Sequence, residues 1–515
     1  MINYIKQENQ GGSIMKKPVI SIILGISLLL LAIVSVLLFR QISTQSPNPF
    51  TNQDNGTPQM GMNPNMGMGG EVTMELVPSK QETKELALPP LLEGTLSSDG
   101  SISYTIATQE GGTQFKEGNA TQTFGYNGSY LGPIIRIRKG QNVHLTTVNK
   151  LEENTSFHWH GLKIPSNVDG GPHSPIKPNG TATVDFTVMQ EAATLWFHPH
   201  PEGRTGEQVY NGLAGLIYVE DENSDSLDLP KDYGINDFPI IVQDRFFDED
   251  NQFNYQDIQN MDGTQGDTLL VNGTINPYIE VKNEKIRLRL VNGSNARNYQ
   301  FNLSSKENFY QIASDGGFLN EPIQMDTLQL VPGERAEIVV DVSDYKKGDN
   351  VKLMNGNAEV LSINVVEGIN SEIKALPKTL NKISTSFNSV SVPDKELTFS
   401  GMGNMVAING KQFDMERIDL QAKTGTKEIW EINNSNDMMG GMIHPFHLHG
   451  VQFKVLDRNG KVPPANEQGW KDTIALYPGE KVQIEVEFPE KGIFMYHCHI
   501  LEHEDNGMMG QIIVE

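Results

Sequence analysis

The chain has 515 residues, of which 64 are acidic and 40 are basic, so its formal net charge is −24. This length exceeds one ordinary domain and fits about three. The acidic balance excludes nucleic acid as a partner, because phosphate binding needs a basic face. A single cysteine, Cys498, excludes a disulfide within the chain and leaves a thiol that is incidental, reactive or metal-binding.

The first predicted element is a transmembrane helix at residues 18–39, a run of 22 residues without a charged side chain. Such a run is long enough to cross a bilayer. Lys16 and Lys17 before it predict that residues 1–17 stay in the cytoplasm and that the rest of the chain lies outside. We therefore expect a membrane-anchored protein of the cell envelope with extracellular domains. Secretion after signal cleavage is the alternative.

Residues 40–84 are predicted to form a disordered linker rich in Met, Gly and Pro. Met60, Met62, Met66 and Met68 stand out in it. Thioethers are soft ligands that suit Cu(I), so the linker either gathers copper or is low-complexity sequence that happens to carry methionine.

The remaining chain is predicted to be all-β, because short runs of Val, Ile, Thr and Leu alternate with polar residues between turn-forming clusters. An Asn-Gly passage recurs at Asn127, Asn272 and Asn409, 145 and 137 residues apart. Each copy leads to an asparagine that follows a β-branched residue, namely Asn149, Asn292 and Asn433. Such a spacing indicates one sandwich per copy. The predicted domains comprise residues 85–225, 226–385 and 386–515.

Ten of the 12 histidines fall into four short strings. The strings are His158-Trp159-His160, His198-Pro199-His200, His444-Pro445-Phe446-His447-Leu448-His449 and His497-Cys498-His499 with His503. Residues two apart on a strand point to the same face, so each H-x-H pair presents two imidazoles side by side. Four pairs supply eight nitrogen ligands for one metal cluster. Residues 226–385 contain no histidine, so the middle domain is expected to be a spacer.

The string around Cys498 argues against zinc as the metal. On a strand, the thiol points away from its two histidine neighbours and can bind a second metal while they bind the cluster. His503 and Met508 follow the cysteine, and His444 lies in another string. Two histidines, one cysteine and a weak axial methionine form a blue-copper electron-transfer site, and zinc has no redox use for this connection.

These strings, together with WFHPHPEGRTGEQVYNGLAGLIYVED and HCHILEHEDNGMM, resemble the multicopper oxidase family over residues 85–515. The family includes laccases and bacterial cuprous oxidases. The resemblance implies three consecutive cupredoxin-like Greek-key β-sandwich domains, with the trinuclear cluster between the first and third. It also implies one-electron oxidation of phenols, aromatic amines or Cu(I), coupled to four-electron reduction of dioxygen to water.

The same resemblance implies four copper ions as cofactors. Carried over residue by residue, it places a type 1 copper at His444, Cys498, His503 and Met508, a type 2 copper at His158 and His447, and two type 3 coppers at His160, His198 and His499 and at His200, His449 and His497.

The family pattern further places proton donors at Asp169, in VDGGP, and at Glu504, next to His503. Each is alternatively a turn residue or a hydrogen-bond anchor. Asp437 and Met442 are candidate contacts for a metal-ion substrate, because cuprous oxidases carry a similar Asp and Met group before this copper ligand. Packing of these methionines under the copper loop is the alternative.

Two other functions use the same fold. A copper-binding or envelope-structural protein without oxidase activity is the main alternative, and the filled ligand positions argue against it. A copper nitrite reductase is disfavoured by the domain count and by the four H-x-H pairs. The expected partners are phenolic or amine substrates or Cu(I), dioxygen and the membrane. Three complete domains suggest a monomer.

Overall fold

The computed structural model describes residues 75–256, 259–366, 368, 373–384, 392–436 and 441–515. The predicted transmembrane helix at residues 18–39 lies outside these residues, as does most of the predicted linker. Among the helices of the described part, none has the length and apolar character needed to cross a bilayer.

Residues 75–84, which were predicted to belong to the disordered linker, contact the sheet-forming part of the chain. The Val77 backbone N–H donates to Asp267 O at 2.8 Å. Strand β1 (Lys84–Glu85) pairs in parallel with β14 (Pro277–Val281). The expected linker therefore overlaps with ordered chain at these ten residues.

The first group of strands forms two sheets, with order β2-β3-β6-β7, where β4 pairs with β3, and order β5-β9-β8. Their bounds are β2 (Thr95–Leu96), β3 (Ile102–Thr113), β4 (Thr121–Tyr126), β5 (Ile134–Arg138), β6 (Asn142–Asn149), β7 (Thr181–Thr187), β8 (Ala193–Phe197) and β9 (Gly215–Glu220). Buried and more exposed residues alternate along β6, as expected for a strand with one face on a core.

The second group forms sheets with order β13-β10-β15-β20-β17-β18 and order β1-β14-β22-β21-β16-β19. Their remaining bounds are β10 (Asp237–Arg245), β13 (Thr268–Val271), β15 (Lys285–Asn292), β16 (Tyr299–Leu303), β17 (Phe309–Ser314), β18 (Gly317–Met325), β19 (Thr327–Leu330), β20 (Arg335–Asp341), β21 (Asn350–Asn355) and β22 (Ala358–Val365). A small hairpin joins β11 (Gln259–Asn260) to β12 (Gly263–Thr264).

The third group forms sheets with order β24-β23-β26-β30-β28 and order β25-β32-β31-β27-β29. Their bounds are β23 (Lys395–Ser400), β24 (Ala407–Ile408), β25 (Leu420–Ala422), β26 (Lys427–Asn434), β27 (His444–Leu448), β28 (Lys454–Arg458), β29 (Thr473–Leu476), β30 (Lys481–Glu487), β31 (Gly492–Cys498) and β32 (Met509–Val514). Helices are short in the described part of the chain: α2 (Thr205–Tyr210), α3 (Glu222–Ser226), α4 (Leu501–Asp505) and the 3₁₀ turns Ser166–Val168, Gly403–Met405 and Ala465–Glu467.

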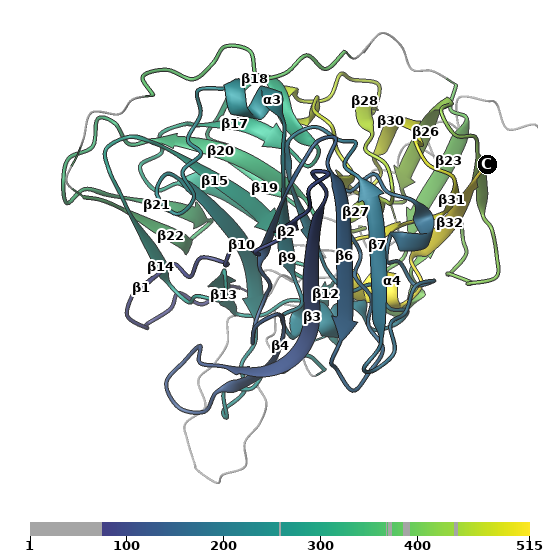
Figure 1. The fold of residues 1–515 in the computed structure, drawn as a ribbon, viewed down its shortest axis with the longest axis horizontal. Coiled ribbons are helices and arrows are strands. Elements are labelled where there is room, and N and C mark those ends of the chain that lie inside the picture. The colour runs from purple at the N-terminus through teal and green to yellow at the C-terminus, as the bar shows by residue number, and fades with distance from the viewer. Residues whose placement is uncertain (1–74, 257–258, 367, 369–372, 385–391, 437–440) are drawn as a thin grey trace, which may run out of the picture. The chain divides into compact units, whose positions relative to one another are not determined.

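The three groups share one strand arrangement, as the internal repeat predicts (Figure 1). Strands β3 and β6, β10 and β15, and β23 and β26 pair in parallel, and the second strand of each pair then pairs antiparallel with β7, β20 or β30. Each group encloses its own core of buried apolar side chains.

The Asn-Gly passages have the same role in each group. Asn127, Asn272 and Asn409 have φ of 55°, 50° and 53°, and each side-chain oxygen accepts a backbone N–H from the first strand of the parallel pair. The later asparagine needs a correction. Asn434 matches Asn149 and Asn292, because all three amides donate to two backbone carbonyls across a loop. The prediction of Asn433 was therefore wrong by one residue.

Candidate metal centre

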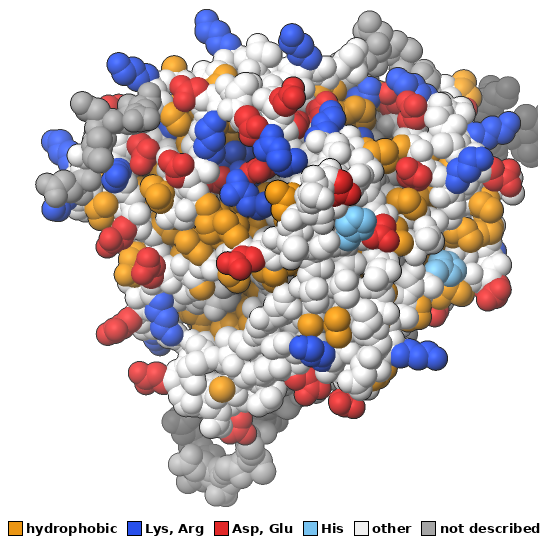
Figure 2. Space-filling model, in the orientation of Figure 1, with side chains coloured by type: hydrophobic (Ala, Val, Ile, Leu, Met, Phe, Trp, Pro, Cys, Tyr) orange, Lys and Arg blue, Asp and Glu red, His pale blue; other side chains and the backbone are white. Residues whose placement is uncertain are grey.

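The four H-x-H pairs converge in the structure because strand pairing brings them together. His158 and His198 exchange backbone hydrogen bonds of 2.8 and 3.1 Å. His447 on β27 lies directly opposite His497 on β31. All ten histidines of the four strings are at most 1% exposed, and on the face drawn in Figure 2 histidine occupies only small patches. The metal-binding candidates are therefore interior groups.

Most rings of the cluster turn Nδ1 outward. Five Nδ1 atoms donate to oxygen: His158 to Asp169 O at 3.0 Å, His198 to Pro199 O at 2.9 Å, His447 to Asp472 O at 2.8 Å, His449 to Asp169 Oδ2 at 2.7 Å and His497 to Cys498 O at 3.0 Å. A neutral imidazole that donates through Nδ1 carries its lone pair on Nε2. Such outer hydrogen bonds are the usual way in which proteins orient metal-binding histidines.

The inward Nε2 atoms face one another at short distances. His158 Nε2 lies 3.3 Å from His447 Nε2, and His497 Nε2 lies 3.3 Å from His200 Nε2 and 2.9 Å from His449 Nε2. Two imidazoles bound to one metal at roughly 2.0–2.1 Å in a tetrahedral arrangement have their nitrogens about 3.3 Å apart. Facing acceptors at this spacing fit a shared metal ion better than a shared proton.

His160 and His499 complete the set of eight. His160 Nε2 donates outward to Asp472 Oδ1 at 3.0 Å, while its Nδ1 lies 3.4 Å from His198 Nε2. The ring of His499 lies 5.0 Å from that of His160 and 5.4 Å from that of His198, centroid to centroid. Both nitrogens of His499 are buried without a hydrogen-bond partner among the described residues. A buried imidazole without partners is costly unless it binds a ligand.

A second group surrounds Cys498. His444 Nδ1 and His503 Nδ1 lie 3.6 and 3.9 Å from its Sγ atom, and the three side chains form one candidate metal-binding group. Cys498 belongs to the apolar core, whereas His497 belongs to the histidine cluster, so the two side chains point to opposite faces, as strand alternation predicts. Met508 is fully buried in the same core, and its carbonyl accepts the Cys498 N–H at 3.0 Å.

Burial sets the protonation of these groups. It lowers the pKa well below the usual histidine range in His160, His198, His200, His444, His447, His449 and His499. Burial is also the main cause that lowers the pKa of His497 to about 3 and that of His503 to about 4. These rings are neutral at pH 7, which is the ligand form. Burial raises the pKa of the Cys498 thiol, so a thiolate here needs a nearby cation.

The two predicted proton donors lie on the outer side of the cluster. Asp169 Oδ2 accepts from His449, while its Oδ1 has no partner among the described residues. The oxygens of Glu504 lie 3.2 Å from His200 Nδ1 and 3.2 Å from His497 Nδ1. Burial, with Asp505 beside it, raises the pKa of Glu504 well above the usual range. A cavity of about 420 Å³ is lined by Glu504, His200, Glu202 and Asp505 and connects this edge with solvent.

Of the two predicted substrate contacts, Asp437 and Met442, the structure describes only Met442. Asp437 lies outside the described residues. Met442 is 5% exposed and belongs to the apolar core. Met261, between β11 and β12, was missed: it is 40% exposed, and its carbonyl accepts from His503 Nε2 at 3.0 Å. Only the fold brings this residue, 242 positions away along the chain, to the thiol site.

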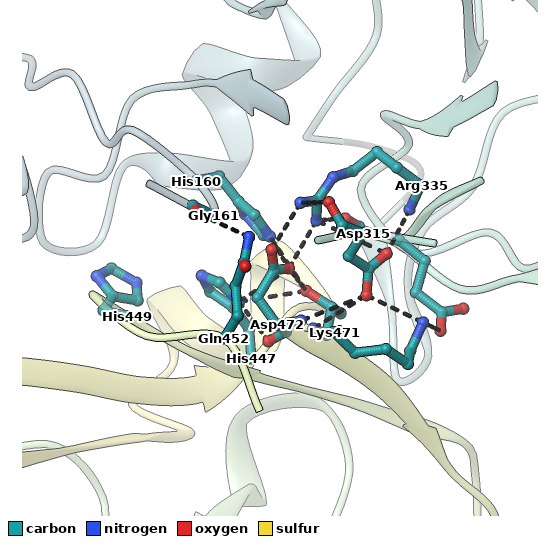
Figure 3. A network of polar contacts seen from close by, with 12 residues as sticks. His160, Gly161, Asp315, Arg335, His447, His449, Gln452, Lys471 and Asp472 are labelled. Carbon is teal, nitrogen blue, oxygen red and sulfur yellow. Dashed lines mark hydrogen bonds and ion pairs between the residues drawn. The ribbon is translucent and has the colours of Figure 1, made fainter. Parts of the chain in front are cut away.

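Sequence reasoning also missed the charged residues around His160 (Figure 3). Arg335 binds Asp472 through two hydrogen bonds of 2.6 Å each, and both side chains are fully buried. Lys471 Nζ lies 2.9 Å from Asp315 and 3.1 Å from Glu334. In the sequence, Glu334-Arg335 and Lys471-Asp472 look like ordinary charged pairs of surface turns, so no local signal distinguishes them.

Comparisons with known proteins agree with this geometry. Residues 107–224, 236–362 and 382–515 each match a multicopper oxidase family model. The multicopper oxidase mco of Staphylococcus aureus is 48% identical over 436 residues, which cover 85% of this chain and 94% of that protein. Cell division protein FtsP of Photorhabdus laumondii subsp. laumondii is 36% identical over 457 residues, covering 84% and 93%.

Among solved structures, a laccase from Pediococcus acidilactici superposes with a TM-score of 0.82 at 44% identity, covering 86% of this chain and 95% of that one. The family-model matches, the similar relatives and the buried histidine cluster all indicate the same family. The chain therefore belongs to the multicopper oxidase family, and it is a copper-dependent oxidoreductase with oxygen as electron acceptor.

Proposed function

We propose that this protein couples one-electron oxidation of phenols, aromatic amines or Cu(I) to four-electron reduction of dioxygen to water. The observation that carries the proposal is the backbone connection at Cys498: its thiol belongs to one candidate metal group, and the adjacent His497 belongs to another. A single chain segment thus joins an electron-accepting site to an oxygen-reducing site.

The twelve predicted ligands would hold four copper ions. The single site uses His444, Cys498, His503 and Met508. The cluster uses His158 and His447 for one ion, His160, His198 and His499 for the second, and His200, His449 and His497 for the third. The donor types fit, because thiolate, thioether and neutral imidazole are ligands that copper accepts. Copper bound there supplies the one-electron chemistry and the reduction of dioxygen.

The surrounding side chains and backbone groups then have to exclude bulk water, orient the ligands and deliver protons. Carbonyl and carboxylate acceptors hold the outward N–H of five cluster imidazoles in fixed directions. We assign proton delivery to Glu504, which lies between the 420 Å³ cavity and the outer edges of His200 and His497. Asp169 Oδ2 holds His449 in place, and the Oδ1 atom of Asp169 is buried without a hydrogen-bond partner among the described residues.

Electron entry is assigned to the surface around Met261. The His503 ring donates a hydrogen bond to the carbonyl of Met261, and the Met261 side chain is exposed to solvent. Only this one residue therefore separates His503 of the thiol site from solvent at this edge, among the described residues. Met405, in the 3₁₀ turn beside it, is 65% exposed, and the Gly403 N–H donates to Met261 O at 2.8 Å. Two exposed thioethers at this edge favour Cu(I) among the substrates.

The substrate proposal is tested by turnover on Cu(I) and on a phenol, with and without excess copper. Met261→Leu and Asp437→Ala are expected to slow Cu(I) oxidation more than phenol oxidation. Met189→Leu is the matched control, because Met189 is also about two-fifths exposed, at 39%, but lies outside the metal centre. Equal losses on both substrates would remove this edge as a metal-ion site.

The oxidase proposal itself is tested by copper content and oxygen uptake. Copper-loaded protein is expected to hold four ions per chain and to consume oxygen when a reductant is added. Fewer than three ions, or no oxygen uptake, would refute it. A structural role is the second candidate, because a relative that is 36% identical is named cell division protein FtsP. A structural role predicts that the function of the protein does not depend on Cys498.

We also propose the arrangement of the whole chain. Residues 18–39 would anchor the protein in the membrane, and domains at residues 85–225, 226–385 and 386–515 would lie outside the cell as a monomer. Protease added to intact cells should then digest the β-rich part but not residues 1–17. Protection of the β-rich part would contradict this orientation.

A further inference from the structure

A buried charge network links the histidine cluster to the middle segment, residues 226–385, which contains no histidine (Figure 3). The network consists of Asp315, Glu334, Arg335, Lys471 and Asp472, which are between 0% and 7% exposed. Charged side chains are rarely buried to this extent unless they pair. Asp315, Glu334 and Arg335 belong to the middle segment. This segment therefore contacts the metal centre through charged side chains and supplies none of its predicted ligands.

Arg335 is held in one orientation. Its five N–H groups donate to Asp472 Oδ1 and Oδ2 at 2.6 Å each, to Gly333 O at 3.0 Å, to Asp315 O at 3.1 Å and to Thr194 O at 3.3 Å. A guanidinium has five such donors, so all are used. A fork-to-fork pair fixes the plane of the carboxylate as well as its position.

Asp472 transmits this orientation to His160. Its Oδ1, bound by Arg335, also accepts from His160 Nε2 at 3.0 Å and from Thr473 Oγ1 at 2.9 Å. An ionised carboxylate only accepts hydrogen bonds, so His160 must carry its proton on Nε2 and its lone pair on Nδ1. His160 Nδ1 is the atom that faces His198. Five other rings of the cluster present Nε2 instead, so His160 is oriented the opposite way.

The packing leaves little freedom at this point. Gly161, directly after His160, has φ of +91°, and a Cβ there would lie 2.7 Å from Asp472 Oδ2 and 2.8 Å from Arg335 Nη2. The ion pair therefore lies against the backbone that carries His160. Rotation of the carboxylate is blocked by the chain on one side and by Arg335 on the other.

We propose that Arg335 is a positioning residue of the oxygen-reducing cluster, which acts through Asp472 to make His160 bind copper through Nδ1. This inference rests on the proposed role of His160 as a cluster ligand. The middle segment is then more than the spacer expected from the sequence, because it determines which ring nitrogen one ligand presents.

The test compares Arg335→Met with Arg289→Met. Arg289 lies in the same segment, binds Asp237 through two hydrogen bonds of 2.7 Å and is similarly buried, but the Asp237 carboxylate, unlike that of Asp472, has no hydrogen bond to a histidine in the described part of the chain. Loss of an outer-sphere partner typically costs about 10–100-fold in metal affinity. Arg335→Met is expected to lower the affinity of the histidine cluster for copper by that factor and to keep the blue band of the Cys498 site. Arg289→Met is expected to keep both.

A second readout needs no copper. Nitrogen NMR of ring-labelled, copper-free protein reports which nitrogen of each histidine is protonated, and His160→Gln identifies the signals of His160. Wild-type protein should show the proton on Nε2 alone, and Arg335→Met should show a mixture. Two results would overturn the proposal. In the first, Arg335→Met binds copper at the cluster with an affinity within about twofold of that of Arg289→Met. In the second, the His160 nitrogen signals of Arg335→Met are the same as in wild-type protein.

Two further variants close the test. Arg335→Lys keeps the charge but not the fork, so it should lose part of the cluster affinity even if the Met variant does not fold; wild-type behaviour would refute the orientation argument. Adding Arg335→Met to Asp472→Asn should cause no further loss, because both act through one carboxylate. Wild-type protein that never binds cluster copper would instead refute the proposed function.

Discussion

Gly333 offers a quantitative test of how closely the middle segment approaches the cluster. This residue has φ of +86°, and a Cβ built on it would lie 2.8 Å from Cδ2, 2.9 Å from Cγ and 3.0 Å from Nε2 of His499. Ordinary van der Waals contact starts at 3.4 Å. The Gly333→Ala substitution therefore requires His499 to retreat by about 0.6 Å, which exceeds the roughly 0.2 Å tolerance of metal–ligand distances.

The expected result is selective loss of copper. His499 is one of three imidazoles assigned to its ion, so its displacement should lower the copper content of the cluster. Cys498, His444 and His503 have no atom among the nearest neighbours of this Cβ, so the blue band should keep its intensity. Copper per chain by mass spectrometry, measured together with the visible spectrum, separates the two sites in one sample.

Gly100→Ala is the matched control for backbone strain. Gly100 also has φ of +86°, and nothing lies within 4 Å of a Cβ at that position. Both substitutions place alanine in the left-handed region, at a cost of about 1–2 kcal/mol. Full copper content in Gly333→Ala, with a melting temperature like that of Gly100→Ala, would show that the His499 ring can move without losing its ligand, and the argument would fail.

Three other predictions follow from the site. Cys498→Ser should abolish the blue band and remove one copper ion while the cluster ions remain, as measured by absorbance and metal content. Glu504→Gln should slow oxygen reduction by about 10²–10⁴-fold, the usual contribution of a positioned proton donor, while anaerobic reduction of the blue band keeps its rate. Burial and Asp315, opposed by Lys471, raise the pKa of Glu334 to about 7. Its stabilising contribution is therefore full below about pH 4.5 and lost as pH rises through 7. Between about pH 4.5 and about pH 7, the free energy of unfolding of copper-free wild-type protein, measured with denaturant, should fall by roughly 3 kcal/mol relative to that of Glu334→Gln. A difference in unfolding free energy that stays constant with pH would contradict the raised pKa.

The parts of the site that the sequence predicts depend on local geometry. Strand alternation places the thiol of Cys498 and the imidazole of His497 on opposite faces, and this rule needs only neighbouring residues. The Asn-Gly repeat likewise predicts the shared strand arrangement, because the left-handed turn and its side-chain hydrogen bond recur at a fixed place. The error at Asn433 has the same origin: pattern spacing cannot separate two adjacent asparagines, whereas the loop they span can.

The contacts that could not be predicted join distant segments. His160 and Asp472 are 312 residues apart, and Arg335 and Asp472 are 137 apart. Charged pairs that follow a Pro-Gly turn usually lie in solvent, and only the docking of the middle segment buries Arg335. Met261 reached the thiol site in the same way. Burial of charge is a property of the assembled chain, so composition and spacing carry no record of it.

This distribution of contacts has a consequence for assembly. One half of the cluster comes from residues 158–200 and the other from residues 444–499, while the orientation of His160 and the wall beside His499 come from residues 315–335. Any ligand that binds only the docked arrangement stabilises it by mass action. Copper uptake and docking of the middle segment are therefore linked. A variant that loosens Arg335 should weaken copper binding, and copper should then protect Arg335 variants against unfolding less than it protects Arg289 variants, because stabilisation by a bound ligand falls as its dissociation constant rises. The segment without ligands then contributes to metal binding through the geometry it imposes on ligands of the other two.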